Sequence, residues 1–254
     1  MEKHFEQIDY FAYHSPFRKY SAMSKFIFTM TLLLLCLYFN NIAISCYIIV
    51  TMLLINVLKN NIKLYDYIVM LSIPFVFVFF GCIAIAIEIH FENHIIIYVT
   101  KQTVLKSICV MARTFGAVSI LYFFTLSTPI YQMVFVFQKL HIPKILTELM
   151  YITYRYLFIL IEIQHQIKIA AISRLGYCDI KTSLKTFSSC IANLFILSLK
   201  KAQKHYQAME ARCYTGELLF LQEKQYYNKT TTIKAILYIL SILLLKIVLR
   251  GQAL

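Results

Sequence analysis

Long apolar runs separated by short polar segments make up much of the chain. The first run, residues 26–58, is interrupted by Asn40 and Asn41 and is too long for one bilayer crossing, which takes about 20 residues. We therefore predict a helical hairpin that turns at the two asparagines. Residues 67–87 predict a third span, and residues 104–126 predict a fourth.

The pattern changes after residue 127, where apolar residues form a stripe along one helical face instead of a continuous run. In residues 131–170 the opposite face carries charged residues. They are Lys144, Glu148, Arg155, Glu162 and Lys168. An amphipathic helix of this kind lies on a membrane, or projects from it, rather than crossing it. Pro143 marks its natural start.

A second amphipathic helix is predicted between Tyr177 and Gly216, because its apolar residues recur at helical spacing. They are Phe187, Ile191, Leu194, Phe195, Leu199, Ala202 and Met209. Ser183 is a candidate N-cap, and Gly176 lies where the preceding helix would need a left-handed C-terminal residue. A last apolar run, residues 233–249, is long enough for one more crossing.

Composition indicates the same class of protein. The chain has 254 residues, 60% of them hydrophobic, and their clustering into long runs is typical of a polytopic membrane protein. We therefore predict an all-α fold with about five transmembrane helices. The predicted regions are a cytoplasmic N-terminal segment (1–25), a transmembrane bundle (26–127), cytoplasmic amphipathic helices (128–232) and a final transmembrane helix with its tail (233–254).

The formal net charge of +13 at pH 7 suggests nucleic-acid binding, because clustered basic residues bind phosphate. These residues lie between the apolar runs, however, as the positive-inside rule predicts for a membrane protein. More than half of the 25 lysines and arginines fall between Lys139 and Lys229, which predicts that this region is cytoplasmic. We therefore predict a multi-pass protein of the cell inner (plasma) membrane that does not bind nucleic acid.

Sequence motifs for catalysis or nucleotide binding are missing. The five glycines allow no G-x-x-x-x-G-K-[ST] loop, and neither G-x-S-x-G nor H-E-x-x-H occurs. The seven cysteines form no C-x-x-C pair, so neither a zinc site nor a disulfide framework is indicated. We expect no catalytic residue, no cofactor and no metal site in this chain, and any ATP must be bound by another protein.

The loop after the third predicted span is the most acidic and histidine-rich short segment of the chain. It contains Glu88, His90, Glu92 and His94. Two histidines one helical turn apart could bind a divalent cation, with a glutamate adding oxygen. No third nitrogen or sulfur ligand is nearby, so a solvated external loop is the favoured interpretation.

Two short motifs in the polar region share one pattern. Ala-x-x-small-Arg occurs at residues 170–174 and again at residues 208–212, and a glycine follows each copy within a few residues. We interpret them as two helix tips that present Arg174 and Arg212. A guanidinium holds a carboxylate bidentately and stays charged at physiological pH, which suits engagement of a partner protein. For either arginine, contact with lipid headgroups or simple solvation is the alternative.

Several segments, in order along nearly the whole chain, carry a family resemblance. They are Thr128-Pro129-Ile130, Pro143, Tyr154-Arg155-Tyr156, residues 170–177, residues 208–212 and Gly216-Glu217-Leu218. With these segments the chain resembles the transmembrane T component of energy-coupling factor (ECF) transporters, in particular the CbiQ type of cobalt or nickel uptake systems. In that family the T component joins a substrate-binding membrane subunit to two ABC-type ATPase subunits. Each of its two coupling helices places an arginine tripeptide in a groove of one ATPase.

The resemblance implies which residues contact the ATPases. The tripeptides correspond to Ser173-Arg174-Leu175 and Ala211-Arg212-Cys213. The family usually reads Ala-Arg-Gly, so both arginines are kept while Ser173, Leu175 and Cys213 depart from the pattern. The residues expected to support the coupling helices are Ala170, Gly176, Ala208, Glu210 and Gly216.

The resemblance also implies partners and a role. The chain would couple ATP hydrolysis by two ATPase subunits to uptake of Co²⁺ or Ni²⁺, together with a CbiM-like substrate-binding (S) subunit and membrane lipid. Crossed helices ending at Arg174 and Arg212 would transmit the movement. The alternatives are the T subunit of a vitamin ECF transporter, a membrane-embedded metal-dependent enzyme built on the histidine loop, and a stand-alone carrier lined by Arg113 or Arg155.

Overall fold

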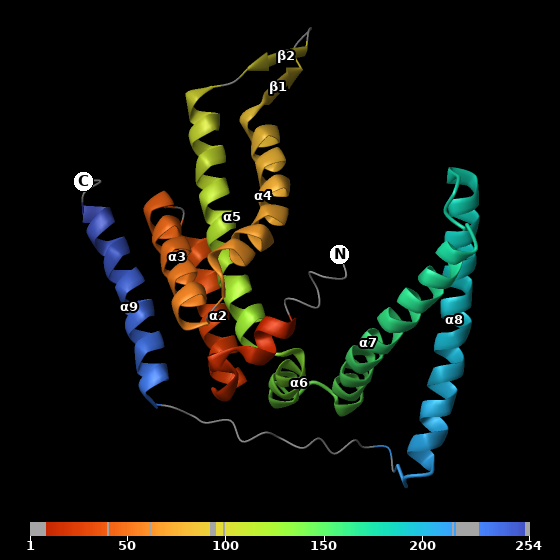
Figure 1. Cartoon of the computed structure of the whole chain (residues 1–254). Coiled ribbons are helices and arrows are strands. Elements are labelled where there is room, and N and C mark those ends of the chain that lie inside the picture. The colour runs from red at the N-terminus through yellow and green to blue at the C-terminus, as the bar shows by residue number, and fades with distance from the viewer. Residues whose placement is uncertain are drawn as a thin grey trace. The chain divides into compact units, whose positions relative to one another are not determined.

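A computed structural model describes residues 9–39, 41–60, 62–91, 95–98, 100–214, 216 and 229–251. The chain forms two compact units. The first comprises residues 3–133 and 224–254, and the second comprises residues 134–223. Figure 1 follows the helices from red at the N-terminus to blue at the C-terminus.

The described part of the first unit contains five long helices. They are α2 (Ala22–Tyr38), α3 (Ile42–Leu54), α4 (Leu64–Ala86), α5 (Lys101–Ser127) and α9 (Lys229–Gly251). A short 3-10 helix, η1 (Pro16–Lys19), precedes α2, and α3 continues directly into a π-helical turn, η2 (Ile55–Lys59). The helix α6 (Ile130–Lys139) begins within this unit.

Within the described residues, five helices are long and apolar enough to cross a membrane: Ile42–Lys59, α4, α5, Ile180–Glu210 and Thr230–Val248. All except Ile180–Glu210 match spans predicted from the sequence. The remaining predicted span is α2, whose 17 residues correspond to about 25 Å. The hairpin between α2 and α3 turns where the sequence predicted, because the Asn41 side chain caps α3 by accepting a hydrogen bond from Ala43 N at 3.1 Å. The prediction of an all-α polytopic membrane protein is confirmed.

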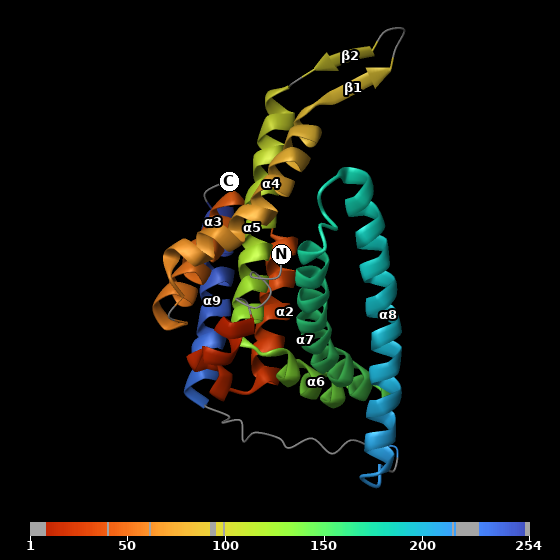
Figure 2. The same cartoon turned by 45° about the vertical axis from the view of Figure 1, so that its right-hand side comes forward.

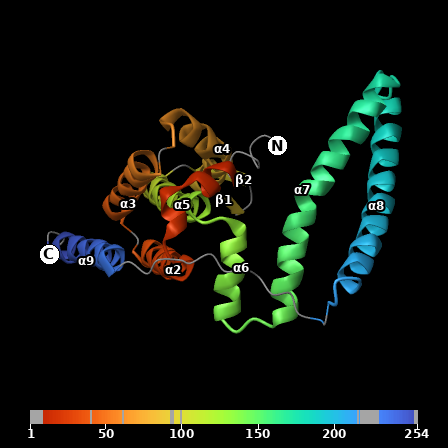
Figure 3. The ribbon, with the colours of Figure 1, turned by 60° about the horizontal axis from the view of Figure 1, so that its bottom comes forward.

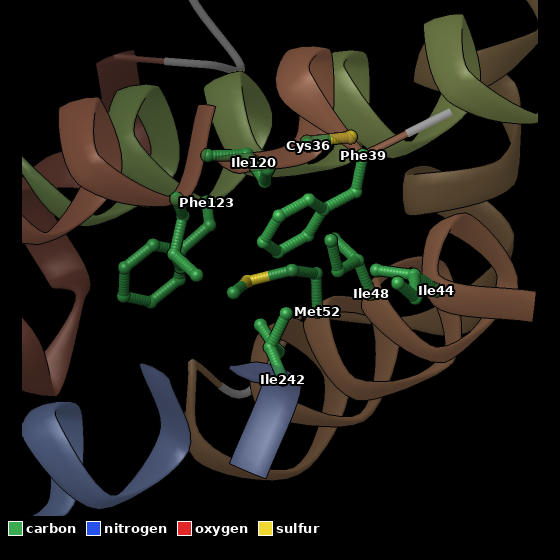
Figure 4. Packing of buried hydrophobic residues seen from close by; sticks show 9 residues of the cluster. Cys36, Phe39, Ile44, Ile48, Met52, Ile120, Phe123 and Ile242 are labelled. Carbon is green, nitrogen blue, oxygen red and sulfur yellow. The ribbon is translucent and has the colours of Figure 1, made fainter. Parts of the chain in front are cut away.

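The helix α5 is central in the first unit and packs against α2, α3 and α4. A cluster of buried apolar side chains lies between α2, α3, α5 and α9. Its members are Leu32, Cys36, Phe39, Ile44, Ile48, Met52, Ile120, Phe123 and Ile242. Figure 4 shows Phe39 and Met52 pointing into the same space as Ile120 and Phe123. Gly116 allows a close approach, since a Cβ there would lie 3.1 Å from Cys36 Sγ.

The segment after α4 is a short antiparallel β-hairpin, visible beyond the ends of α4 and α5 in Figures 1 and 2. β1 (Glu88–Phe91) pairs with β2 (Ile95–Tyr98). The helical spacing considered for the two histidines is not observed at His90, because this residue lies in an extended strand. Glu92 and His94 lie outside the described residues.

Polar hydrogen bonds close the end of the bundle at which α2 begins. Lys25 is 7% exposed, and its Nζ donates to the backbone oxygens of Phe17 at 3.2 Å and Ser127 at 2.8 Å. Asn60, next to η2, accepts a hydrogen bond from Ser15 Oγ. Lys25 is therefore part of the folded bundle.

The described part of the second unit contains a helical hairpin. Its helices α7 (Lys144–Ser173) and α8 (Ile180–Glu210) run antiparallel and pack against each other, as Figures 1 and 3 show. The amphipathic segment predicted from residue 131 is therefore two helices. The chain turns at His141, whose φ is 61°, and α7 begins after Pro143, as the sequence predicted.

The helix α8 contains no buried residue, although its apolar stripe follows the predicted helical spacing. In that stripe Leu194 is half-buried, whereas Phe187 and Phe195 are 58% and 62% exposed. Contact with α7 includes the ring of His205, whose centroid lies 5.2 Å from that of Tyr156. The periodicity therefore predicted the helix correctly, but it did not predict which face packs within this unit.

Candidate functional site

The first candidate motif forms the C-terminal end of α7. The Leu175 N–H donates to Ile172 O at 3.0 Å, and the Gly176 N–H donates to Ala171 O at 2.9 Å. Leu175 has a φ of 56°, in the left-handed region. Two such bonds around one left-handed residue make a Schellman motif, which satisfies carbonyls that the helix end would otherwise leave unpaired. Arg174 is the C-cap residue of this helix.

The second candidate motif ends α8 in the same way. The Cys213 N–H donates to Glu210 O at 3.0 Å, and Cys213 has a φ of 58°. The Tyr214 N–H donates to Met209 O at 3.1 Å. Arg212 comes directly before the left-handed residue, as the first arginine does in its own turn. The two arginines therefore occupy equivalent positions in equivalent turns.

The left-handed residue is the third residue of each predicted tripeptide. The expected Ala-Arg-Gly pattern has glycine there, and glycine adopts a positive φ without a steric penalty. Leu175 and Cys213 adopt the same conformation at a cost of about 1 kcal/mol each. Leu175 and Cys213 therefore differ from the expected glycine in type, but the shape of the turn is the same.

Both arginine side chains are exposed. Among the described residues, neither Arg174 nor Arg212 forms an ion pair or a side-chain hydrogen bond. Ala170 and Ala208 each come four residues before an arginine, so each lies on the same side of its helix as that arginine. Both alanines are also exposed. Each guanidinium therefore lies at a helix end, next to a small residue, where a partner protein can reach it.

Gly176 has a different role from the predicted one. The sequence placed it in the left-handed position, but Leu175 takes that conformation. A Cβ on Gly176 would lie 2.9 Å from Ala171 O and 2.9 Å from Thr186 Oγ1 of α8. These distances are too short for a side chain, so glycine is needed for the close approach of the turn to α8.

Two further residues were predicted from local signals. Ser183 is not the N-cap of α8, because the helix begins at Ile180 with Asp179 as its N-cap. Aspartate is as good a capping residue as serine, so residue type alone does not choose between them. Gly216 has a φ of 94°, which agrees with the left-handed conformation typical of glycine.

The two arginines lie at opposite ends of the hairpin. Arg174 is in the turn between α7 and α8, and Arg212 follows α8, whose 31 residues correspond to about 45 Å. The Tyr214 hydroxyl donates to Glu148 Oε2 at 3.1 Å, which joins the second tip to the beginning of α7. The sequence analysis expected crossed coupling helices that end at the two arginines. They fold back, so the tips are separated rather than adjacent.

Tyr214 and Glu148 are site residues that sequence reasoning missed. The sequence placed Glu148 on the charged face of an amphipathic helix, but its side chain is only 7% exposed. Desolvation of the phenol, together with its hydrogen bond to the Glu148 carboxylate, raises the pKa of Tyr214. The partners are 66 residues apart, so no local pattern could pair them.

The residues considered for the two alternative functions, a metal-dependent enzyme and a stand-alone carrier, give less support to those functions. In the part of the chain that the structure describes, no group of three or more His, Cys, Asp or Glu side chains could hold a metal ion. Arg113 lies half-buried in α5, where its backbone oxygen accepts a hydrogen bond from Cys36 Sγ at 3.7 Å. Arg155 is exposed on α7. No observation favours a pore lined by these two arginines.

Comparison with known proteins places the chain in a family. Residues 14–227 match the CbiQ family, described as cobalt transport protein. An uncharacterized protein of Methanocaldococcus jannaschii is 28% identical over 240 residues, which cover 91% of this chain and 88% of the relative. Cobalt transport protein CbiQ of Salmonella typhimurium is 26% identical over 157 residues (58% of this chain and 70% of the relative). A Methanocorpusculum labreanum protein named as a fused cobalt transport protein CbiMQ is 27% identical over 247 residues, which cover 91% of this chain but 40% of the relative. The chain therefore belongs to the CbiQ cobalt transport protein family.

Proposed function

We propose that the chain is the transmembrane coupling (T) subunit of an ECF-type ABC importer for Co²⁺ or Ni²⁺. It joins two ABC-type ATPase subunits to a CbiM-like substrate-binding membrane subunit. The observation that carries the proposal is the pair of equivalent arginine turns at opposite ends of one hairpin. A separation of about 45 Å suits contact with two different ATPase subunits.

The chemistry of each tip supports contact with an acidic groove. A cation at a helix C-terminus is stabilised by the helix dipole, so the charge is favourable even before a partner binds. The guanidinium then offers a rigid fork of donors to a carboxylate. The residues proposed to enter the ATPase grooves are Ser173, Arg174 and Leu175 at one tip and Ala211, Arg212 and Cys213 at the other.

The substrate and the second membrane partner follow from the family. The CbiQ family is described as cobalt transport protein, which favours a metal ion over a vitamin as the substrate. The relative named as a fused CbiMQ protein supports a CbiM-like subunit as the partner of a chain of this kind. We place the hairpin in the cytoplasm because basic residues are concentrated there.

The proposed mechanism is mechanical. ATP binding and hydrolysis move the two ATPase grooves, and the tips follow because each is fixed in one groove. Long helices transmit this displacement to the membrane bundle, which holds the substrate-binding subunit. Such coupling requires an element with two arrangements that nucleotide biases, and the hairpin between the tips is that element.

Charge reversal at both tips tests the proposal. Arg174→Glu combined with Arg212→Glu should reduce co-purification of the ATPases at least about 30-fold. The reason is that the loss of each arginine leaves a carboxylate of the ATPase groove without its partner. ATP-dependent Co²⁺ uptake by reconstituted complexes should be lost as well. The matched control is Arg155→Glu, which reverses an exposed arginine in the middle of α7.

Two results would contradict this function. One is an intact complex with full uptake in the double variant. The other is Co²⁺ transport by the purified chain alone in liposomes without ATP, which would favour the stand-alone carrier.

A further inference from the structure

A cavity of about 300 Å³ lies within the first unit, and no residue of the arginine tips is among its described lining residues. It is formed by the beginning of α2, the end of η2, α5 and the beginning of α9. Its walls include the aromatic rings of Phe28, Phe123 and Tyr238. The size is at the lower end for small-molecule sites, which are typically about 300–1,000 Å³. The cavity can therefore hold a headgroup and the first part of a hydrocarbon chain.

Positive charge gathers at this cavity. Lys25, Lys59 and Lys234 line it, and its described lining contains no aspartate or glutamate. The Lys25 ammonium is buried and bonded to two backbone carbonyls, which carry no net charge to balance it. Lys59 and Lys234 are exposed, so their ammonium groups can turn toward a bound anion. A ligand with a negative charge is strongly favoured over a neutral or cationic one.

The cavity also lies where lipid headgroups are expected. Lys59 is the last residue of the candidate span Ile42–Lys59, and Lys234 is near the beginning of the candidate span Thr230–Val248. Both lysines are thus at the boundary between an apolar helix and its polar flank. Basic pockets between membrane helices at this level bind anionic headgroups.

The apolar walls of the cavity favour a lipid over a simple anion as the ligand. Inorganic phosphate would use the lysines but would leave the aromatic side of the cavity without a partner. The neighbouring outer surfaces of α2 and α9 are also apolar, with Ile27 53% exposed and Ile236 62% exposed. An acyl chain that leaves the cavity can continue along these surfaces, where removal from water stabilises it.

We propose that this cavity binds one anionic phospholipid of the bilayer. Lys59 and Lys234 contact its phosphate, Lys25 forms part of the polar wall, and the aromatic walls hold the first part of an acyl chain. Such a lipid joins α9 to α2 and η2, so it stabilises the return of the chain to the bundle after the hairpin.

Fluorescence quenching tests this site in the full-length protein. The chain has no tryptophan, so Tyr20→Trp introduces a single reporter among the residues that line the cavity. Tyr65→Trp is the matched reporter for ordinary surrounding lipid, because Tyr65 is 76% exposed in the first turn of α4 and does not line the cavity. Both proteins are reconstituted in phosphatidylcholine vesicles that contain increasing fractions of brominated phosphatidylglycerol or brominated phosphatidylcholine.

Brominated phosphatidylglycerol should quench the Tyr20→Trp reporter with a preference of about tenfold or more over brominated phosphatidylcholine. The Tyr65→Trp reporter should show almost no preference between the two lipids. Replacing Lys59 and Lys234 by glutamine should weaken the preference by up to about fivefold per lysine, so that the double variant keeps almost none of it. The matched control replaces Lys19 and Lys63, which are also exposed in the described structure but do not line the cavity. This control pair should change the preference less than about twofold, since screened surface charges act weakly on one bound lipid.

A variant that leaves the charge unchanged keeps the test independent of general electrostatics. Ala235 lines the cavity, so Ala235→Leu should reduce quenching at Tyr20→Trp by taking up space that the acyl chain needs. Equal quenching by the two lipids would overturn the proposal, and so would an equal loss in the control pair. Displacement by millimolar inorganic phosphate would also overturn it, because the ligand would then be the free anion.

Discussion

The membrane bundle and the arginine hairpin are held together differently. In the bundle, α5 packs against three neighbouring helices, and Leu32, Ile48 and Ile120 are completely buried. In the hairpin, α8 has no buried residue, and hydrogen bonds at its ends define the two turns. The comparison indicates that the bundle is a stable frame. The hairpin instead keeps its shape through a few contacts at its ends and leaves most of its surface for partners.

Removing the same side chain from each region should give the largest difference. Ile48 is completely buried in the bundle, whereas Ile191 on α8 is 52% exposed. Ile48→Ala should lower the free energy of unfolding by about 3 kcal/mol, because it removes packed methyl groups and leaves a cavity. Ile191→Ala should change it by less than about 0.5 kcal/mol. Chemical unfolding of the purified protein measures both, and equal losses would mean that α8 is packed as tightly as the bundle.

Adding one methyl group at Gly176 should have the next largest effect. Gly176→Ala should destabilise the turn between α7 and α8 by about 2 kcal/mol, because the new Cβ meets Ala171 O and Thr186. Gly81→Ala in α4 is the control, since a Cβ there meets nothing within 4 Å. That change should be neutral or slightly stabilising, as expected for alanine in a helix. Hydrogen exchange at the end of α7 reports the local effect, and unchanged protection in Gly176→Ala would contradict the close approach.

Removal of one hydroxyl group tests the connection at the other end of the hairpin. Tyr214→Phe should speed amide exchange at the second tip several-fold, because the buried Glu148 carboxylate loses a donor. Tyr65→Phe is a suitable control, because Tyr65 is exposed in the first turn of α4. Faster amide exchange in residues 209–214 of the Tyr214 variant alone is the expected result, and identical exchange in both variants would show that the Tyr214 bond is dispensable.

Glycine at the left-handed positions should produce the smallest effect and the opposite sign. Leu175→Gly and Cys213→Gly should each stabilise their turns by about 1 kcal/mol or less, since a positive φ no longer carries a steric cost. The amides of Gly176 and Tyr214 should then exchange more slowly. Faster exchange would indicate that the leucine and cysteine side chains themselves hold the turns.

Sequence reasoning predicted features that depend on local patterns. The apolar runs located the spans, and Asn41 closes the first hairpin because its side chain caps the next helix. The alanine-arginine motifs located both helix ends. The left-handed residue was assigned one position too late, to Gly176 instead of Leu175, because glycine is favoured there but is not obligatory.

Features that depend on contacts distant in sequence could not be predicted. Glu148 was assigned to an exposed face because charge is normally solvated, but it is buried and accepts a hydrogen bond from Tyr214, 66 residues away. The burial of Lys25 could not be predicted either, because the Ser127 carbonyl that accepts its hydrogen bond is 102 residues away. The direction of the two tips was also open, because helical periodicity does not determine how two helices pack.

Photo-crosslinking tests most directly whether the tips contact two different ATPase subunits. A photoreactive phenylalanine analogue replaces Ser173, Ala211 or both in the assembled transporter, so that both arginines are kept. The masses of the products give their stoichiometry. Each single replacement should yield one chain joined to one ATPase, and the double replacement should yield one chain joined to two. A double replacement that yields only the product with one ATPase, or no crosslink from either tip, would contradict the account.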